Sequence, residues 1–107
     1  MIVLFSPDCE HCQHETEEII KHIDAFEKVQ IIMCTMLPYD KMAAFYTKYD
    51  LKRFDNIIMG KDMNYMLPAF YNVRNLPFLA FYNKKKELIS VFEGSLPIEK
   101  VIEEIRK

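Results

Sequence analysis

The chain is poor in the residues that mark flexible linkers and disulfide frameworks. Its 107 residues include only two glycines and five prolines, which argues against a linker or a low-complexity segment. Three cysteines are too few for a disulfide framework. No internal repeat of the kind that builds solenoids is visible in the sequence. Together with a hydrophobic content of 50%, these absences predict one compact domain spanning residues 1–107.

The sequence also lacks an excess of one charge and any long apolar run. Its 14 basic and 16 acidic residues are interspersed and give a formal charge of -2, so we expect no nucleic-acid partner. No stretch approaches the roughly 20 apolar residues of a membrane span, so we expect no direct membrane span in this chain. Residues 2–5 are too short for a signal-peptide core, and the given sequence shows no targeting signal. Lys84-Lys85-Lys86 is the one local run of positive charge, and we interpret it as a solvated turn that needs no partner.

What the sequence does contain is a succession of short apolar runs and amphipathic stretches. Residues 2–5 (Ile-Val-Leu-Phe) form a continuous apolar run, which predicts a strand buried on both faces. A helix should begin near residues 9–12, with Asp8 as its N-cap, because apolar residues then recur at helical spacing from Ile19 to Phe26.

The middle of the chain predicts a second strand and further helical structure. Residues 29–37 form an apolar run that predicts the second strand, and residues 40–49 have a helical pattern. Residues 56–59 predict a minor strand or a loop. Asp62 can cap a further helix through about residue 71, which Pro68 should kink or end.

The last third of the chain predicts a hairpin and a closing helix. Residues 78–82 and 88–92 are apolar and are joined by a short polar turn, which indicates two antiparallel strands. A helix begins near Ser95 and carries apolar residues at helical spacing to Ile105. The order β-α-β, helical segment, β-β-α predicts an α/β fold with a central mixed sheet and helices on both faces.

A Cys-x-x-Cys pair stands at the junction between the first strand and the first helix. Its two sulfurs lie about one helical turn apart, which is close enough for a disulfide bond. The first sulfur lies near unpaired backbone N–H groups and the positive end of the helix dipole, and both favour a thiolate. A thiolate is the species that attacks a disulfide. We therefore expect Cys9 to be the exposed nucleophile and Cys12 the shielded resolving thiol.

Neighbouring polar residues leave alternatives open. Protonated His11 would favour the Cys9 thiolate, whereas Glu10 would oppose it. Cys9, His11, Cys12 and His14 could together supply zinc ligands, but they crowd into six residues with no second ligand pair, so we expect no metal. We expect no other cofactor, because a haem site needs His directly after the second cysteine.

Cys34 stands apart from this pair, inside the predicted second strand. We interpret it as a small buried hydrophobe, with a resolving or regulatory thiol as the alternative.

Three segments of the chain resemble the thioredoxin superfamily. The segment VLFSPDCEHCQHE is similar to its strand, active-site motif and helix, and YNVRNLPFLAFY to its later loop and cis-proline. The segment ELISVFEGSLPIEKVIEEI is similar to its closing strand, glycine and helix. An extra segment over approximately residues 37–62 resembles the insertion of the TlpA/ResA-like branch.

The resemblance implies roles for further residues. In that branch a carboxylate often follows the second cysteine by three residues, and Glu15 stands there and could assist proton movement. A solvated helix glutamate is the alternative. The resemblance implies a cis bond at Pro77 beside the cysteine pair, with the backbone of Leu76 binding the extended chain of a substrate. It also favours an extracytoplasmic, periplasmic bacterial setting.

Two classes of function remain open at this point. The first is a thiol-disulfide oxidoreductase that acts on protein or peptide cysteines through a Cys9–Cys12 cycle and exchanges electrons with an upstream redox partner. The second is a redox-silent thioredoxin-fold module that binds peptides. A zinc-stabilised domain is a third and weaker possibility.

Overall fold

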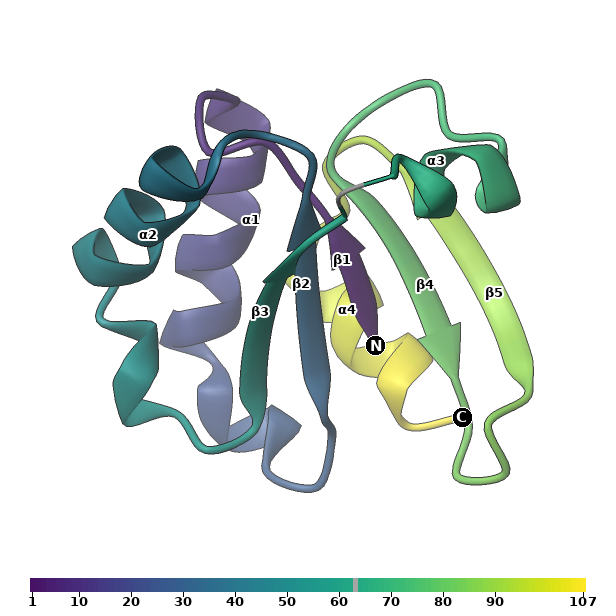
Figure 1. Cartoon of the computed structure of the whole chain (residues 1–107). Coiled ribbons are helices and arrows are strands. Elements are labelled where there is room, and N and C mark those ends of the chain that lie inside the picture. The colour runs from purple at the N-terminus through teal and green to yellow at the C-terminus, as the bar shows by residue number, and fades with distance from the viewer. Residues whose placement is uncertain (63) are drawn as a thin grey trace.

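A five-stranded mixed sheet forms the centre of the molecule (Figure 1). The computed structural model describes residues 1–62 and 64–107. The strands run in the order β3-β2-β1-β4-β5. β1 pairs in parallel with β2, and β2 with β3, whereas β1 and β4, and β4 and β5, are antiparallel. The bounds of the strands are Ile2–Leu4 (β1), Ile31–Thr35 (β2), Ile57–Lys61 (β3), Phe78–Tyr82 (β4) and Leu88–Glu93 (β5).

Helices cover both faces of this sheet, so the predicted fold class is confirmed. Helices α1, α2 and α4 contribute Ile19, Phe45 and Val101 to a large apolar cluster on one face. Helix α3 lies on the other face, where Leu67 and Tyr71 pack against Leu4, Phe78 and Ala80. The bounds of the helices are Glu10–Lys21 (α1), Tyr39–Lys48 (α2), Met66–Tyr71 (α3) and Ile98–Ile105 (α4), with 3-10 turns at Ile23–Phe26 (η1) and Leu51–Arg53 (η2).

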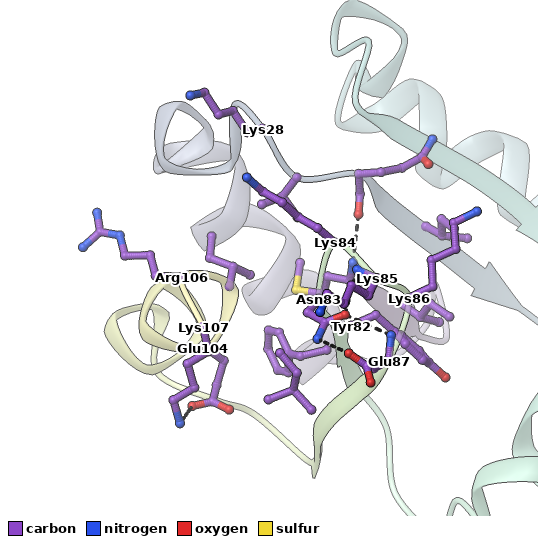
Figure 2. A pocket seen from close by; sticks show the side chains of 18 residues that line it. Lys28, Tyr82, Asn83, Lys84, Lys85, Lys86, Glu87, Glu104, Arg106 and Lys107 are labelled. Atoms are coloured by element: carbon purple, nitrogen blue, oxygen red, sulfur yellow. Dashed lines mark hydrogen bonds and ion pairs between the residues drawn. The ribbon is translucent and has the colours of Figure 1, made fainter.

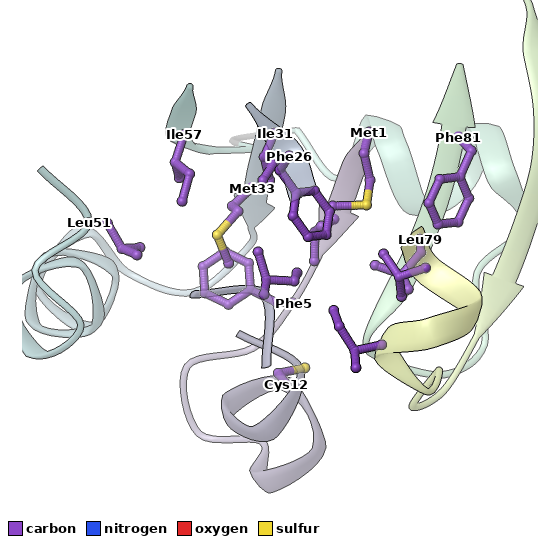
Figure 3. Packing of buried hydrophobic residues seen from close by; sticks show 14 of the residues in the cluster. Met1, Phe5, Cys12, Phe26, Ile31, Met33, Leu51, Ile57, Leu79 and Phe81 are labelled. Carbon is purple, nitrogen blue, oxygen red and sulfur yellow. The ribbon is translucent and has the colours of Figure 1, made fainter. Parts of the chain in front are cut away.

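The alternation of side chains along β1 explains the two clusters. Val3 and Phe5 point into the larger cluster, which Figure 3 shows together with Cys12, whereas Leu4 points into the smaller one. Burial on both faces explains why residues 2–5 are apolar without interruption, as the sequence indicated. No helix within the described ranges 1–62 and 64–107 is long and apolar enough to cross a membrane.

The start of α1 differs from the prediction. Cys9 is the N-cap residue, and the structure shows no side-chain hydrogen bond capping this helix among the described residues, so the prediction of Asp8 as N-cap was wrong. The Asp8 carboxylate instead lies 3.0 Å from the Lys41 ammonium at the start of α2. The first helix is also shorter than its apolar periodicity suggested, because α1 ends at Lys21 and a 3-10 turn continues to Phe26.

The predicted helix after Asp62 is present in part. Residue 63 lies outside the described residues, and α3 spans Met66–Tyr71. The N-cap residue is Tyr65 rather than Asp62, but the Asp62 carboxylate accepts hydrogen bonds from the backbone N–H groups of Met66 and Leu67 at 3.1 and 2.8 Å and so satisfies two donors at the start of the helix. Pro68 does not end this helix, contrary to expectation, because it lies in the first turn, where a backbone N–H has no partner within the helix.

The segment over residues 37–62 contributes α2, η2 and β3. β3 is an edge strand parallel to β2, and this settles the choice between strand and loop for residues 56–59 in favour of a strand. β2 is shorter than predicted: it covers Ile31–Thr35 rather than residues 29–37. The hairpin of β4 and β5 forms as expected from their short connection.

Candidate functional site

The two cysteines of the Cys-x-x-Cys pair differ sharply in their exposure. The chain leaves β1, turns through residues 6–8 and enters α1 at Cys9, which has an extended backbone conformation. Cys9 is half-buried, whereas Cys12 is 1% exposed. Both are free thiols. This geometry leaves Cys9 as the sulfur that is open to a partner.

Cys12 faces the interior, where it receives a hydrogen bond from the backbone of the preceding loop. The Ser6 N–H donates to its Sγ at 3.5 Å. Burial raises the pKa of Cys12 to about 12, although the Ser6 N–H works in the opposite direction. The side chain of Cys9 and the charge of Glu15 reinforce the effect of burial. Cys12 is therefore a protonated thiol at neutral pH.

Glu15 lies one turn after Cys12 on the same face of α1 and is 2% exposed. Its Oε1 accepts a hydrogen bond from the Leu96 N–H at 2.7 Å. Burial raises the pKa of Glu15 above its ordinary value, and the Leu96 N–H partly opposes this. The reading of Glu15 as a solvated helix glutamate was therefore wrong, because the carboxyl group is buried near the thiol of Cys12.

The Leu76–Pro77 peptide bond is cis, the isomer that the resemblance implied. The register of the sheet places it at the same end as the cysteines, because Leu4 pairs with Phe78. The residues that follow β1 therefore lie beside those that precede β4. Leu76 is half-buried and packs against both apolar clusters.

The segment from Gly94 to Leu96 connects the buried glutamate to the cis-proline. The Gly94 N–H donates to the Pro77 carbonyl at 2.8 Å, and the Leu96 N–H donates to Glu15. Gly94 has a φ of 83°, in the left-handed region that glycine adopts without strain. Sequence reasoning treated this segment only as the end of a strand and the start of a helix. Gly94 was the one residue in the sequence that could have pointed to this segment. Its hydrogen-bond partner, however, is set by tertiary contacts.

The remaining predicted residues lie at the margins of this site. Glu10 and His11 are exposed, and neither side chain forms a hydrogen bond or ion pair with a described residue.

Within residues 1–62 and 64–107, no group of three Cys, His, Asp or Glu side chains could hold a metal ion. Cys34 is half-buried and packs against the smaller cluster, on the opposite face of the sheet from Cys12.

Comparison with solved structures bears on the architecture of the whole chain. A secreted Mycobacterium tuberculosis disulfide oxidoreductase homologous to E. coli DsbE matches 98% of this chain and 78% of its own, with a TM-score of 0.81 and 18% identity. The fold is thioredoxin-like. A putative thioredoxin from Neisseria meningitidis shares this thioredoxin-like fold at a TM-score of 0.81 and 19% identity, over 98% of this chain and 70% of its own.

A third structure, StoA from Bacillus subtilis, matches 95% of this chain and 78% of its own, with a TM-score of 0.76 and 16% identity. No protein-family model and no curated protein matches the sequence. At these identities the comparisons establish the thioredoxin-like fold, and the chemistry of the site has to be argued from its own residues.

Proposed function

We propose that the protein is a thiol-disulfide oxidoreductase that exchanges disulfides with protein cysteines through a Cys9–Cys12 cycle. One observation carries this proposal: a half-buried Cys9 stands at the start of α1, and a fully buried Cys12 lies one turn behind it. A partly exposed sulfur can meet a substrate, and a shielded sulfur can meet only its neighbour. This division of roles is what the two halves of a disulfide exchange need.

The reaction consists of two exchanges. The Cys9 thiolate attacks one sulfur of a substrate disulfide, so a Cys9–substrate disulfide forms and the other substrate sulfur leaves as a thiolate. The Cys12 thiolate then attacks Cys9, so the Cys9–Cys12 disulfide forms and the reduced substrate departs. The substrate gains two electrons and the cysteine pair loses two. An upstream redox partner reverses the change in the pair, and the same steps run backwards in an oxidant.

Glu15 is the group that would accept the proton of Cys12 in the second exchange. The pKa of Cys12 is raised to about 12, so few molecules hold it as a thiolate at neutral pH. The charge of Glu15 acts on Cys12 directly, and the carboxyl group has an elevated pKa of its own. A base with a raised pKa is better matched to proton transfer near neutral pH. The exposed Glu10 and His11 would adjust the charge around Cys9.

Leu76 and Pro77 would form the substrate-binding edge. Neither backbone polar group of Leu76 takes part in a backbone hydrogen bond with another described residue. Both groups are therefore available to pair with an extended segment of a substrate, as in the addition of a strand to a sheet. We place this activity outside the cytoplasm, on the resemblance to the TlpA/ResA-like branch and on the secreted M. tuberculosis neighbour.

Substitution of the cysteines tests the proposal. Cys9→Ser should lower the rate of insulin-disulfide reduction to the level of the uncatalysed reaction, because the attacking sulfur is gone. Cys12→Ser should accumulate a mixed disulfide on Cys9, detectable by mass spectrometry, because nothing resolves it. Cys34→Ser is the control and should keep full activity, since Cys34 lies on the other face of the sheet. Full activity of the Cys9→Ser protein would contradict the proposal.

The direction of electron flow needs a separate measurement. Equilibration of the wild-type protein with mixtures of reduced and oxidised glutathione gives the reduction potential of the Cys9–Cys12 pair. A wild-type protein that binds peptides but forms no disulfide in any mixture would instead be a redox-silent binding module.

A further inference from the structure

A large concave surface lies at the end of the sheet opposite the cysteine pair. It is an open hollow of about 940 Å³ formed by segments that are far apart in the sequence. Figure 2 shows its lining, with lysine side chains around the turn between β4 and β5. We call its six basic residues the basic pole: they are Lys28, Lys84, Lys85, Lys86, Arg106 and Lys107.

Tertiary structure creates this cluster. Lys28 follows η1, the three consecutive lysines form the β4–β5 turn, and Arg106 and Lys107 follow α4. In the sequence only Lys84-Lys85-Lys86 stands out, and a solvated turn accounts for it. The fold brings three further cations to that turn from two other segments. A solvated turn does not explain why these cations gather there.

Most cations of the basic pole have no partner among the described residues. Lys107 pairs with Glu104 at 2.8 Å, but the other five form no ion pair within the described part of the chain. Elsewhere Lys21, Lys41, Arg53 and Lys100 each lie within 4.0 Å of a carboxylate. The pole therefore concentrates cations that the protein itself does not neutralise.

The charge of the chain is strongly segregated as a result. The concave surface holds six of the 14 basic residues and two of the 16 acidic ones, Glu87 and Glu104. It thus carries +4 on a chain whose formal charge is -2, which leaves -6 for the remainder. The longest dimension of the molecule is 34 Å, several times the Debye length of about 8 Å at physiological ionic strength. A negatively charged surface would therefore attract this end of the molecule and orient it.

Apolar side chains lie among these cations. Ile2, Ile32 and Ile89 line the concave surface, and Leu88, directly after the lysine turn, is exposed. This arrangement is complementary to a membrane surface, where anionic lipid headgroups would attract the cations and the hydrocarbon layer would take up the apolar side chains.

We propose that the basic pole docks the protein onto a membrane surface rich in anionic lipids. In this orientation the N-terminal end of β1 faces the bilayer, and the cysteine pair beyond its C-terminal end points away from it (Figure 1). Cys9 remains accessible to soluble substrates while the protein is bound. The docking surface shares no residue with the proposed active site, so either proposal can fail without the other.

Vesicle flotation with the full chain tests the proposal. The probes are vesicles of phosphatidylcholine alone and vesicles of equal parts phosphatidylcholine and phosphatidylglycerol. The wild-type protein should float only with the anionic vesicles, and added salt should release it. Lys84→Gln, Lys85→Gln and Lys86→Gln together should weaken this binding roughly a hundredfold, because three of the six cations are lost.

A matched control removes the same charge elsewhere. Lys48, Lys52 and Lys61 form no ion pair among the described residues and lie outside the concave surface. Their joint replacement by Gln should weaken binding far less than the turn variant does. Both triple variants should retain the circular dichroism spectrum of the wild type and its insulin-reduction rate.

Three results would overturn the proposal. One is the absence of flotation with anionic vesicles at low salt. A second is an equal loss of binding in the two triple variants, which would indicate net charge rather than a docking surface. The third is binding of a soluble polyglutamate peptide as tight as that of the vesicles, which would assign the basic pole to an acidic protein segment.

Discussion

At the scale of single residues, the buried pair of Cys12 and Glu15 distinguishes this site from a surface dithiol. Both side chains lie on one face of α1 and are almost fully buried, and burial raises the pKa of each. A carboxyl group that is buried without a cation costs stability when it is ionised. The Leu96 N–H offsets part of this cost by donating a hydrogen bond to the Glu15 carboxyl group, and the proposed proton transfer with Cys12 would give the buried group a chemical role.

Replacement of Glu15 by Gln should change how stability depends on pH. The folded pKa of Glu15 is raised, so the unfolded chain releases this proton at lower pH than the folded protein. Wild-type stability should therefore fall as pH rises from the unfolded pKa through the folded one. Gln keeps an acceptor for the Leu96 N–H but has no proton to lose. The stability of the variant should therefore not decrease over this pH range on account of residue 15.

The measurement is urea unfolding at about pH 4 and about pH 8, and the variant should gain stability relative to wild type between them. Glu99→Gln, at an exposed position of α4, is the control and should show little change. The Glu15→Gln protein should also resolve mixed disulfides more slowly. If the difference in stability between the variant and the wild type stayed constant across this pH range, Glu15 would have the same pKa in the folded and unfolded chains, and the prediction would be wrong.

At the scale of elements, the short helix α3 depends on one side chain outside it. Six residues are too few to form a stable helix alone, and α3 is stabilised by packing on the sheet and by the Asp62 carboxylate. The chain runs from this helix to the cis-proline, so the capping interaction also anchors the segment that leads to the candidate site.

Asp62→Ala should therefore destabilise the protein by about 1 kcal/mol, within the usual range for loss of a helix cap. Urea unfolding measures this, and Asp55→Ala is the matched control, because Asp55 is exposed and its carboxylate forms no ion pair with a described residue. Limited proteolysis should cut the Asp62→Ala protein faster near α3. Equal stability of the two variants would mean that sheet packing alone stabilises this helix.

At the scale of the whole molecule, the two faces of the sheet are unequally covered. Three helices close the face that holds the large cluster, whereas α3 alone covers part of the other. On that second face Ile58 and Val91 are 49% and 44% exposed, at the two edges of the sheet. Most of the stability gained from apolar burial should therefore come from the first face.

Two leucines of the hairpin test this inequality. Leu79 on β4 is 0% exposed, whereas Leu88 on β5 is 51% exposed. Leu79→Ala should cost about 2–5 kcal/mol, because it leaves a cavity in the large cluster. Leu88→Ala should cost less than about 1 kcal/mol. Chemical denaturation compares the two, and similar losses would show that Leu88 is more buried in solution than the structure indicates.

Much of the fold could be predicted from local patterns. The strands and helices appear in the expected order, because the hydrophobic periods of 2 and 3.6 act over a few neighbouring residues. One error fell where a tertiary contact outweighs local preference, because Asp8 pairs with Lys41 on α2 instead of capping α1. The other was local: the helix begins late enough that Pro68 lies in its first turn and does not end it.

The sequence by itself determined that two cysteines stand one turn apart at the start of a helix in a mixed α/β domain, because strand and helix patterns are local. Only the tertiary structure decided that Glu15 is buried beside Cys12, that the segment from Gly94 to Leu96 connects Glu15 to the cis-proline, and that cations from three distant segments form one pole. Burial and the convergence of charge depend on which distant segments pack together, and no short stretch of sequence contains that information.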